Sequence, residues 1–358
     1  MISLSNQDIS ILKDLSVHIT ASPSNRPGLF CKQAKMCSNY LPEHIQKKMQ
    51  DFAKNGSEKG FLLIRTAPLG EIPDTPSTNN QKRGESTLLA KIQAIFVQSI
   101  SEMLAYEAEG YGRLFQDIVP MKSMSEKQVS VGNSELEIHT EQAFSELRPD
   151  ILSLACLRGD RAAKTFIFPV KKILDNLSKE DSEFLRKDLW KTGVDLSFKL
   201  MNNLIRTPSF AEDSNSSRSM TDKEMNTTPD GRFQIFSGVI NPVDSTEDMR
   251  GPFPIISGSP EDPFLRFDQD LMKGITEESN QMVKKIVDLY YEHRKEHCLE
   301  PGDVVLIDNN RAVHGRSGFS PRYDGKDRFL IRCFSMFDFK KSEYARTDGE
   351  RMISAIYS

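Results

Sequence analysis

The sequence lacks long apolar runs and any marked excess of one charge. No stretch approaches the roughly 18 consecutive apolar residues that a membrane-spanning helix needs. The 47 basic and 51 acidic residues leave a net charge of −4, which disfavours a surface built for nucleic acid or anionic lipid. Residues 1–20 carry neither the basic nor the apolar region of a secretory signal. We therefore expect a cytoplasmic globular protein that binds neither nucleic acid nor membranes.

Cysteine and histidine are both scarce. The five cysteines are odd in number and irregularly spaced, which favours reduced thiols over a disulfide framework. There are only six histidines. Any site that needs imidazole groups must therefore be built from a short list.

The apolar pattern of the chain changes from about residue 126. Before that point, apolar residues recur at helical spacing in 6–15 and 86–104, and 60–65 reads as one buried strand. Beyond it, short apolar segments alternate with polar turns. The candidate strands are 127–132, 135–140, 151–157, 164–168, 232–240, 303–309 and 328–337. Two helical insertions are predicted, at 170–193 and 277–298.

Many short strands joined by polar turns favour a barrel or a two-sheet jelly roll over a parallel sheet. We predict an α+β chain with a mainly β core, organised as one domain over 1–358. Its N-terminal region, residues 1–110, is helical, and residues 111–340 form the jelly-roll core. Residues 207–231 hold only four apolar side chains in 25. They are either a disordered surface excursion or a mobile lid, and composition does not separate these alternatives.

The segment LEIHTEQAF, 136–144, places His139 and Glu141 two residues apart on a predicted strand. Side chains at that spacing share one face. Three explanations are open. The pair lies on a half-exposed strand face, or it is an acid–base pair, or it supplies two ligands of a metal whose third ligand lies elsewhere.

A third ligand must come from the remaining histidines. His293 and His297 have a two-ligand spacing on a predicted helix, but their neighbours are charged and a solvated helix end is the better interpretation. His314 follows a buried strand and an Asp-Asn-Asn turn, and Gly315 comes next. Two histidines and one carboxylate form the facial triad of non-haem iron(II) oxygenases. The candidate metal site is therefore His139, Glu141 and His314.

Two arginines on one predicted strand suggest anion-binding groups. Arg328 and Arg332 are four residues apart and share a face, with Leu330 between them. They are either solvated at a strand edge or directed into the barrel. Inside the barrel, each guanidinium would need a carboxylate partner. Two carboxylates suit an enzyme that binds a 2-oxoacid and a carboxylate-bearing substrate.

The motifs IHTE (138–141), VHGR (313–316) and RFLIR (328–332) resemble those of the clavaminate synthase-like iron(II)/2-oxoglutarate oxygenases. Within that family they are most similar to hydroxylases of free arginine, asparagine or lysine. The use of Glu rather than Asp as metal carboxylate makes the resemblance specific. It implies a double-stranded β-helix (a cupin-like jelly roll) with flanking helices and a flexible lid. It also implies Fe(2+), with 2-oxoglutarate and O2 as cosubstrates, and a small-molecule amino acid as partner, and it allows a homo-oligomer.

The resemblance also implies residue roles. The three residues of the candidate metal site would hold iron. Arg328 would bind the C5 carboxylate of 2-oxoglutarate, and Thr165 would donate a hydroxyl to it. Arg332 would bind the α-carboxylate of the amino acid, Gln116 would lie near its α-amino group, and Ser130 would add a polar contact.

The segment FLRFDQDLM, 264–272, contains the candidate contacts to the substrate side chain. On an extended segment, Asp268 and Asp270 would share one face and complement a cation. The alternative is a solvated acidic turn or the cap of the helix near residue 277. In relatives that act on arginine, a matching acidic pair binds the side chain. We expect hydroxylation of L-lysine at C4 with release of succinate and CO2. The alternatives are L-arginine or L-ornithine as substrate, or a non-enzymatic, cupin-like metal-binding protein.

Overall fold

The computed structural model describes residues 1–127, 129–195, 197–199, 226–227, 233–234, 249–346 and 351–357. Apart from the two-residue strands β9 (Asn226–Thr227) and β10 (Phe233–Gln234), which pair with each other, the predicted lid at 207–231 and the predicted strand at 232–240 lie outside these residues. No helix among the described residues combines the length and apolar character needed to cross a membrane.

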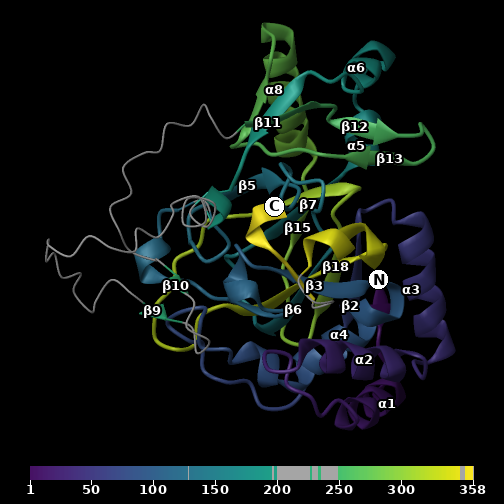
Figure 1. The fold of residues 1–358 in the computed structure, drawn as a ribbon, viewed down its shortest axis with the longest axis vertical. Helices are drawn as coiled ribbons and strands as arrows, with labels where there is room; N and C mark the ends of the chain where they lie inside the picture. The colour runs from purple at the N-terminus through teal and green to yellow at the C-terminus, as the bar shows by residue number, and fades with distance from the viewer. Residues whose placement is uncertain are drawn as a thin grey trace, which may run out of the picture.

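Four helices form an N-terminal layer on one side of the molecule (Figure 1). They are α1 (Asn6–Val17), α2 (Pro27–Ser38), α3 (Glu43–Asn55) and α4 (Leu88–Ile100). Ser5 caps α1, because its hydroxyl accepts the N–H of Asp8 while the Asp8 carboxylate accepts the N–H of Ser5. Helix α4 is mostly buried and contacts the other three helices and strand β6. The N-terminal layer thus packs on the β core through α4.

The larger sheet runs in the order β1-β2-β16-β6-β18-β3-β19, with β4 also paired to β18. Its strands are β1 (Ile2–Ser3), β2 (Phe61–Arg65), β3 (Glu102–Tyr106), β4 (Gln116–Ile118), β6 (Ile151–Arg158), β16 (Val304–Asp308), β18 (Phe329–Met336) and β19 (Met352–Ile353). Every residue of β16 and β18 is buried, as continuous apolar runs predict for central strands.

The smaller sheet has the order β15-β7-β17-β5. Its strands are β5 (Leu136–His139), β7 (Thr165–Pro169), β15 (Glu296–His297) and β17 (Ala312–Arg316). Apolar side chains from both sheets, such as Ile167 of β7 and Leu154 of β6, belong to one buried cluster. Two packed, largely antiparallel sheets confirm the predicted mainly β, jelly-roll core.

A third group of elements covers the outer face of the smaller sheet, at the top of Figure 1. It comprises α5 (Val170–Leu174), α6 (Lys179–Phe184), β8 (Trp190–Gly193), β11 (Met249–Phe253), β12 (Ile256–Gly258), β13 (Pro263–Leu265), β14 (Met272–Gly274) and α8 (Glu277–His293). Tyr290 of α8 packs on Phe166 and Phe168 of β7. Short 3-10 turns complete the fold: η1 (Gly84–Ser86), η2 (Gly110–Gly112), η3 (Lys122–Met124), η4 (Phe339–Ala345) and η6 (Ala355–Tyr357).

Three predicted elements are wrong. The strand at 127–132 is a series of turns that follows η3. The helix at 170–193 is two short helices followed by strand β8. The helix at 277–298 ends at His293, and His297 lies in β15, where it pairs with Thr165 and its ring packs on Phe61.

Candidate metal and substrate site

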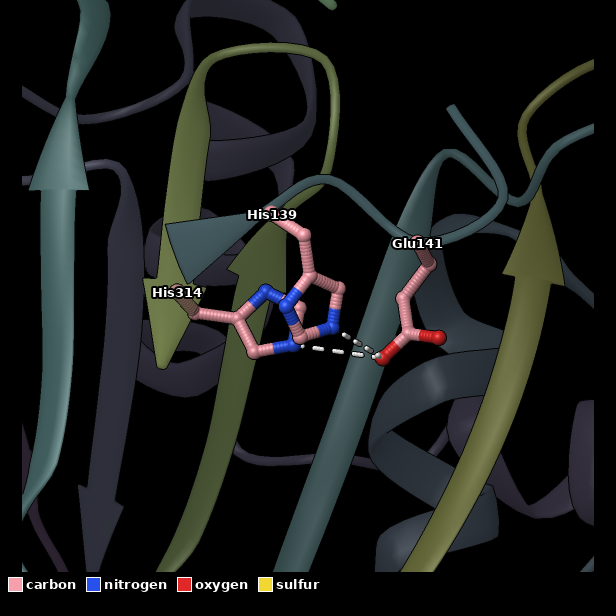
Figure 2. A group of neighbouring side chains, drawn as sticks. All are labelled: His139, Glu141 and His314. Carbon is pink, nitrogen blue, oxygen red and sulfur yellow. Dashed lines mark hydrogen bonds and ion pairs between the residues drawn. The ribbon is translucent and has the colours of Figure 1, made fainter. Parts of the chain in front are cut away.

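The three predicted metal ligands meet between β5 and β17 (Figure 2). His139 ends β5 and lies opposite His314 of β17 in the sheet register. One ligand atom of each of His139, Glu141 and His314 lies within 4.8 Å of the others. The Glu141 Oε1 atom is 3.2 Å from His314 Nε2 and 3.9 Å from His139 Nε2. Among the described residues, no other group of histidine, cysteine or acidic side chains has this arrangement.

Backbone contacts orient two of these ligands. His139 Nδ1 is 2.8 Å from the carbonyl oxygen of Glu137, which leaves Nε2 to face the site. Asn309 Oδ1 accepts the N–H of Glu141 at 2.7 Å, and its amide nitrogen donates to the Glu141 carbonyl at 3.1 Å. Asn309 belongs to the turn before β17 and is fully buried. The turn that precedes His314 therefore also positions Glu141.

The surroundings of the triad set ionisation states that suit a metal. Burial raises the pKa of Glu141, but Arg332 and His314 outweigh it and hold the pKa at about 2. Burial and the neighbouring His139 lower the pKa of His314. At neutral pH the carboxylate is charged and His314 is neutral, which are the forms that bind a divalent metal.

Arg332 connects the triad to a second acidic residue. Its Nη1 atom is 3.5 Å from Glu141 Oε1, and its Nη2 atom forms an ion pair with Glu109. Its Nε atom donates to Gln116 Oε1 at 3.0 Å, because Arg332 of β18 and Gln116 of β4 are paired in the sheet. The sequence does not predict Glu109 here. It lies in a turn with no motif, and only the pairing of β4 with β18 brings it to the site.

Gly110 is required for this arrangement. Its φ is +59°, and a Cβ atom there would lie 2.2 Å from Gln116 Cδ. A side chain would both strain the backbone and collide with Gln116. The glycine thus permits the close approach of the Glu109 turn to Gln116.

Arg328 is buried without a partner. It is 7% exposed, and its side chain makes no hydrogen bond or ion pair with any residue that the structure describes. Burial lowers the pKa of its guanidinium to about 10. Arg328 lines a cavity of about 360 Å³ together with Asp160, Arg161, Arg322 and Lys326. A buried cation that has no direct hydrogen bond or ion pair with a described residue is a candidate for an anion-binding group.

The other two predicted polar contacts lie elsewhere. Thr165 is buried at the start of β7 and lines a second cavity, of about 290 Å³, but its side chain makes no hydrogen bond to Arg328. Ser130 lies in a turn rather than a strand, and its carbonyl oxygen accepts a hydrogen bond from Arg316 Nη1 at 3.2 Å.

The prediction that Asp268 and Asp270 share one face of an extended segment is wrong. The chain turns here, because Asp268 Oδ1 accepts the N–H groups of Asp270 at 3.0 Å and Leu271 at 2.7 Å. Asp268 is buried and its backbone forms an isolated bridge with His139. Asp270 is exposed. Only Asp268 is therefore placed beside the metal site.

Asp195 takes a position that sequence reasoning missed. It follows β8, whose Gly193 N–H donates to the Leu271 carbonyl at 3.0 Å, beside the turn that holds Asp268. Burial, reinforced by Asp268 and Glu109, raises the pKa of Asp195 well above its ordinary value. Its carboxyl group makes no hydrogen bond or ion pair with a described residue. In the sequence it resembles an ordinary helix-capping aspartate.

The chain also matches known proteins. Residues 47–334 match the family model described as "Taurine catabolism dioxygenase TauD, TfdA family". An L-lysine 3-hydroxylase from Catenulispora acidiphila is 38% identical over 99% of this chain and 89% of that protein. An L-asparagine oxygenase from Streptomyces coelicolor is 26% identical over 97% of this chain and 93% of that protein.

Solved structures agree with the fold. An asparagine oxygenase in complex with Fe(II), 2S,3S-3-hydroxyasparagine and succinate superposes with a TM-score of 0.81 at 24% identity, covering 99% of this chain and 98% of the other. The family match spans most of the chain, and the predicted resemblance to the clavaminate synthase-like oxygenases is confirmed. The chain belongs to the TauD/TfdA family of dioxygenases.

Proposed function

We propose that the protein is an iron(II)- and 2-oxoglutarate-dependent hydroxylase of a free basic L-amino acid, with L-lysine as the first candidate. The observation that carries the proposal is the convergence of His139, Glu141 and His314, with the buried Arg332 3.5 Å from Glu141. Two histidines and one carboxylate fit iron(II) and leave coordination positions for cosubstrates. When bound with 2-oxoglutarate, iron supplies the oxygen activation that hydroxylates a C–H bond and releases succinate and CO2.

Arg328 is the proposed anchor of the cosubstrate. Its guanidinium is buried, unpaired among the described residues and adjacent to a cavity. A planar guanidinium binds a carboxylate through two parallel hydrogen bonds, so the C5 carboxylate of 2-oxoglutarate would supply the missing counter-charge. Thr165, at the start of β7 in the smaller sheet, stays a candidate hydroxyl donor.

Arg332 and Glu109 are the proposed partners of the amino acid's main-chain charges. They form an ion pair with each other, so one positive and one negative group lie side by side. An amino-acid zwitterion presents the opposite two charges. Its carboxylate would pair with Arg332, and its ammonium would pair with Glu109. Gln116 would support Arg332, and Ser130 stays a prediction without a contact to this group.

Asp268 and Asp195 are the proposed partners of a cationic side chain, with Asp195 in the role that the sequence suggests for Asp270. Burial, together with repulsion from Asp268 and Glu109, raises the pKa of Asp195, and a cation bound between the carboxylates would relieve that repulsion. The similarity to an L-lysine 3-hydroxylase supports a basic substrate. L-arginine and L-ornithine remain the alternatives.

The position of hydroxylation is the finest element of the proposal. The motifs suggest C4, whereas the relative at 38% identity is named an L-lysine 3-hydroxylase. We therefore propose C3, with C4 as the alternative. The choice depends on small differences in how the substrate is placed relative to the metal.

The test is an assay of succinate release by the iron-loaded protein with 2-oxoglutarate, run with the twenty amino acids and ornithine. We expect L-lysine to give the largest rate above the reaction without amino acid, with one succinate per hydroxylated product. Nuclear magnetic resonance of the product distinguishes C3 from C4. If the protein binds iron but none of these amino acids leads to succinate release, it would instead be a metal-binding cupin-like protein.

A further inference from the structure

Gln142, the residue after Glu141, has an unfavourable backbone conformation. Its φ is +52°, in the left-handed region that a residue with a side chain rarely adopts. Three other non-glycine residues share this feature, Lys82, Tyr111 and Tyr323, but none of them is buried. Gln142 is 2% exposed. Strain at a buried position next to a metal ligand suggests that the conformation serves the site.

Only one of the two polar atoms of the Gln142 amide has a hydrogen-bond partner among the described residues. Its Nε2 atom donates to Glu109 Oε2 at 3.1 Å. Because a carboxylate oxygen accepts hydrogen bonds and does not donate them, the atom that faces Glu109 must be the amide nitrogen of Gln142. The amide oxygen, Oε1, is buried and has no hydrogen-bond partner in the part of the chain that the structure describes. A buried acceptor without a donor is unfavourable, and native proteins rarely keep one without a reason.

The chemistry around this oxygen indicates the missing donor. The other oxygen of Glu109 forms an ion pair with Arg332. A donor placed beside Glu109 and Gln142 would need several N–H groups and a positive charge. A primary ammonium has three N–H donors and no acceptor. An acceptor amide next to a carboxylate therefore fits an ammonium better than a neutral hydroxyl.

We propose that Gln142 is a substrate-binding residue whose Oε1 accepts a hydrogen bond from the α-ammonium group of the amino acid. This inference rests on the proposed function, in which Glu109 balances the charge of the same ammonium. The strained backbone directs the Gln142 amide to Glu109, while the preceding Glu141 faces the metal. One turn of chain thus serves both the metal and the substrate.

The test compares Gln142→Gly and Gln142→Leu with the wild type. Glycine relieves the backbone strain and removes the amide, so the variant should melt no lower than the wild type. Binding is measured by calorimetry without oxygen, on protein loaded with iron and 2-oxoglutarate. We expect both variants to bind L-lysine more weakly by roughly ten- to a hundredfold. Binding of 6-aminohexanoate, which lacks the α-ammonium, should stay within about twofold, as should that of 2-oxoglutarate.

Lys82→Gly is the matched control, because it relieves the same left-handed strain, at φ 58°, away from Glu109. Its affinity for L-lysine should equal that of the wild type. The role of Gln142 would be overturned if the variants lost affinity for L-lysine and 6-aminohexanoate equally, or if their affinity for L-lysine were unchanged. A wild type that neither binds an amino acid nor releases succinate with one would overturn the proposed function itself, before any variant is made.

Discussion

At the scale of single residues, Arg332 links Glu141, a predicted metal ligand, to Glu109, a proposed substrate contact. The guanidinium lies 3.5 Å from the Glu141 carboxylate and also pairs with Glu109. A change at Arg332 therefore alters both the charge near the metal and the charge near the amino acid. Arg328 is four residues away and makes neither contact. We therefore expect substitutions at Arg328 to weaken the binding of 2-oxoglutarate and to leave the binding of the amino acid unchanged.

The metal triad gives the first prediction. His139→Ala or His314→Ala should abolish iron binding and succinate formation, because two protein ligands hold the metal far more weakly than three. His293→Ala is the control, since His293 ends α8 and its imidazole forms an ion pair with the exposed Glu292. Iron content after anaerobic reconstitution and succinate release are measured for all three. If His293→Ala lost its iron while His139→Ala kept it, the proposed metal triad would be refuted.

The second prediction concerns the acidic residues near the substrate. Asp195→Asn and Asp268→Asn each keep the shape but remove a partner from a buried cation, which costs about 3–5 kcal/mol. That corresponds to a loss of roughly two to four orders of magnitude in kcat/KM for L-lysine. Norleucine, which lacks the terminal charge, should lose much less.

Asp270→Asn is the matched control for this pair. Asp270 is exposed and lies in the same turn as Asp268, so its kcat/KM for L-lysine should stay close to that of the wild type. Equal losses for L-lysine and norleucine in the other two variants would show that Asp195 and Asp268 support the fold instead.

Sequence reasoning reaches the triad but not the residues around it. His139 and Glu141 lie two residues apart at the end of a predicted strand, and His314 follows a recognisable strand and turn, so local pattern is sufficient to find them. Glu109, Gln142 and Asp195 join the site through sheet pairing and turns between distant segments. No periodicity marks such residues, because their positions depend on tertiary contacts.

At the scale of elements, strand β18 determines the layout of the site. It pairs with β6 along one side and with β3 and β4 along the other. Arg332 lies within it and Arg328 directly precedes it. A strand held on both sides cannot change register without exposing its buried residues. The two arginines therefore keep a fixed spacing.

The turn that carries Glu109 gives the third prediction. Gly110→Ala should raise the KM for the amino acid and lower stability, because the new Cβ would lie 2.2 Å from Gln116 Cδ. Gly70→Ala is the matched control. Gly70 has a similar φ of +71°, but its nearest neighbour would be 3.7 Å away, so it should show only the backbone cost of about 1 kcal/mol. Steady-state kinetics and urea unfolding measure both effects, and equal results for the two variants would contradict the collision.

The same physics explains which elements can be predicted. Strands β6, β16 and β18 are mostly apolar, and their predicted bounds agree with the structure to within one residue. The segment 127–132 imitates a strand, because Val129 and Val131 alternate with polar residues. It folds as turns instead, with the Lys127 N–H donating to the Met124 carbonyl at 3.0 Å. Alternation over so few residues does not distinguish a strand from a turn.

At the scale of the whole molecule, the N-terminal helices and the β core share one interior. Leu12, Phe30 and Ile95 of the helices belong to the same buried cluster as Val304 and Ile331 of the sheet. We propose on this basis that 1–358 forms one domain, in which the helical region (residues 1–110) and the jelly-roll region (residues 111–340) fold together.

Cooperative unfolding is the fourth prediction. The only tryptophan, Trp190, is buried in β8, far along the chain from the N-terminal helices. Its fluorescence and the far-ultraviolet circular dichroism of the helices should therefore change at the same urea concentration. Two separate transitions would show that the helical region is an independent domain.

The fifth prediction concerns pH. The Asp117 carboxylate of β4 accepts the N–H groups of Arg83 at 2.9 Å and Gly84 at 3.0 Å, and so joins the two regions of the domain. Burial raises the pKa of Asp117 from 3.8 to about 6. The folded state therefore binds the proton more tightly than the unfolded state. Stability from this group is fully present below the unfolded pKa and is lost as the pH rises through about 6, a change of about 3 kcal/mol.

Urea unfolding of the wild type and Asp117→Asn at about pH 4.5 and about pH 7.5 tests this sign. Asparagine does not titrate, so the wild type should lose stability relative to the variant at the higher pH. A difference between the two proteins that does not change with pH would show that the Asp117 pKa is not raised.

The fixed spacing of the arginines around β18 has a consequence for the length of the molecules that the enzyme accepts. Four residues of extended strand span about 13 Å. With 2-oxoglutarate held at Arg328 and the amino acid at Arg332, as proposed, the two anchors cannot move apart. An oxoacid one methylene longer, such as 2-oxoadipate, would have to bend or displace its keto group from the metal site. Chain length would then be selected by the fixed length of a strand of the scaffold.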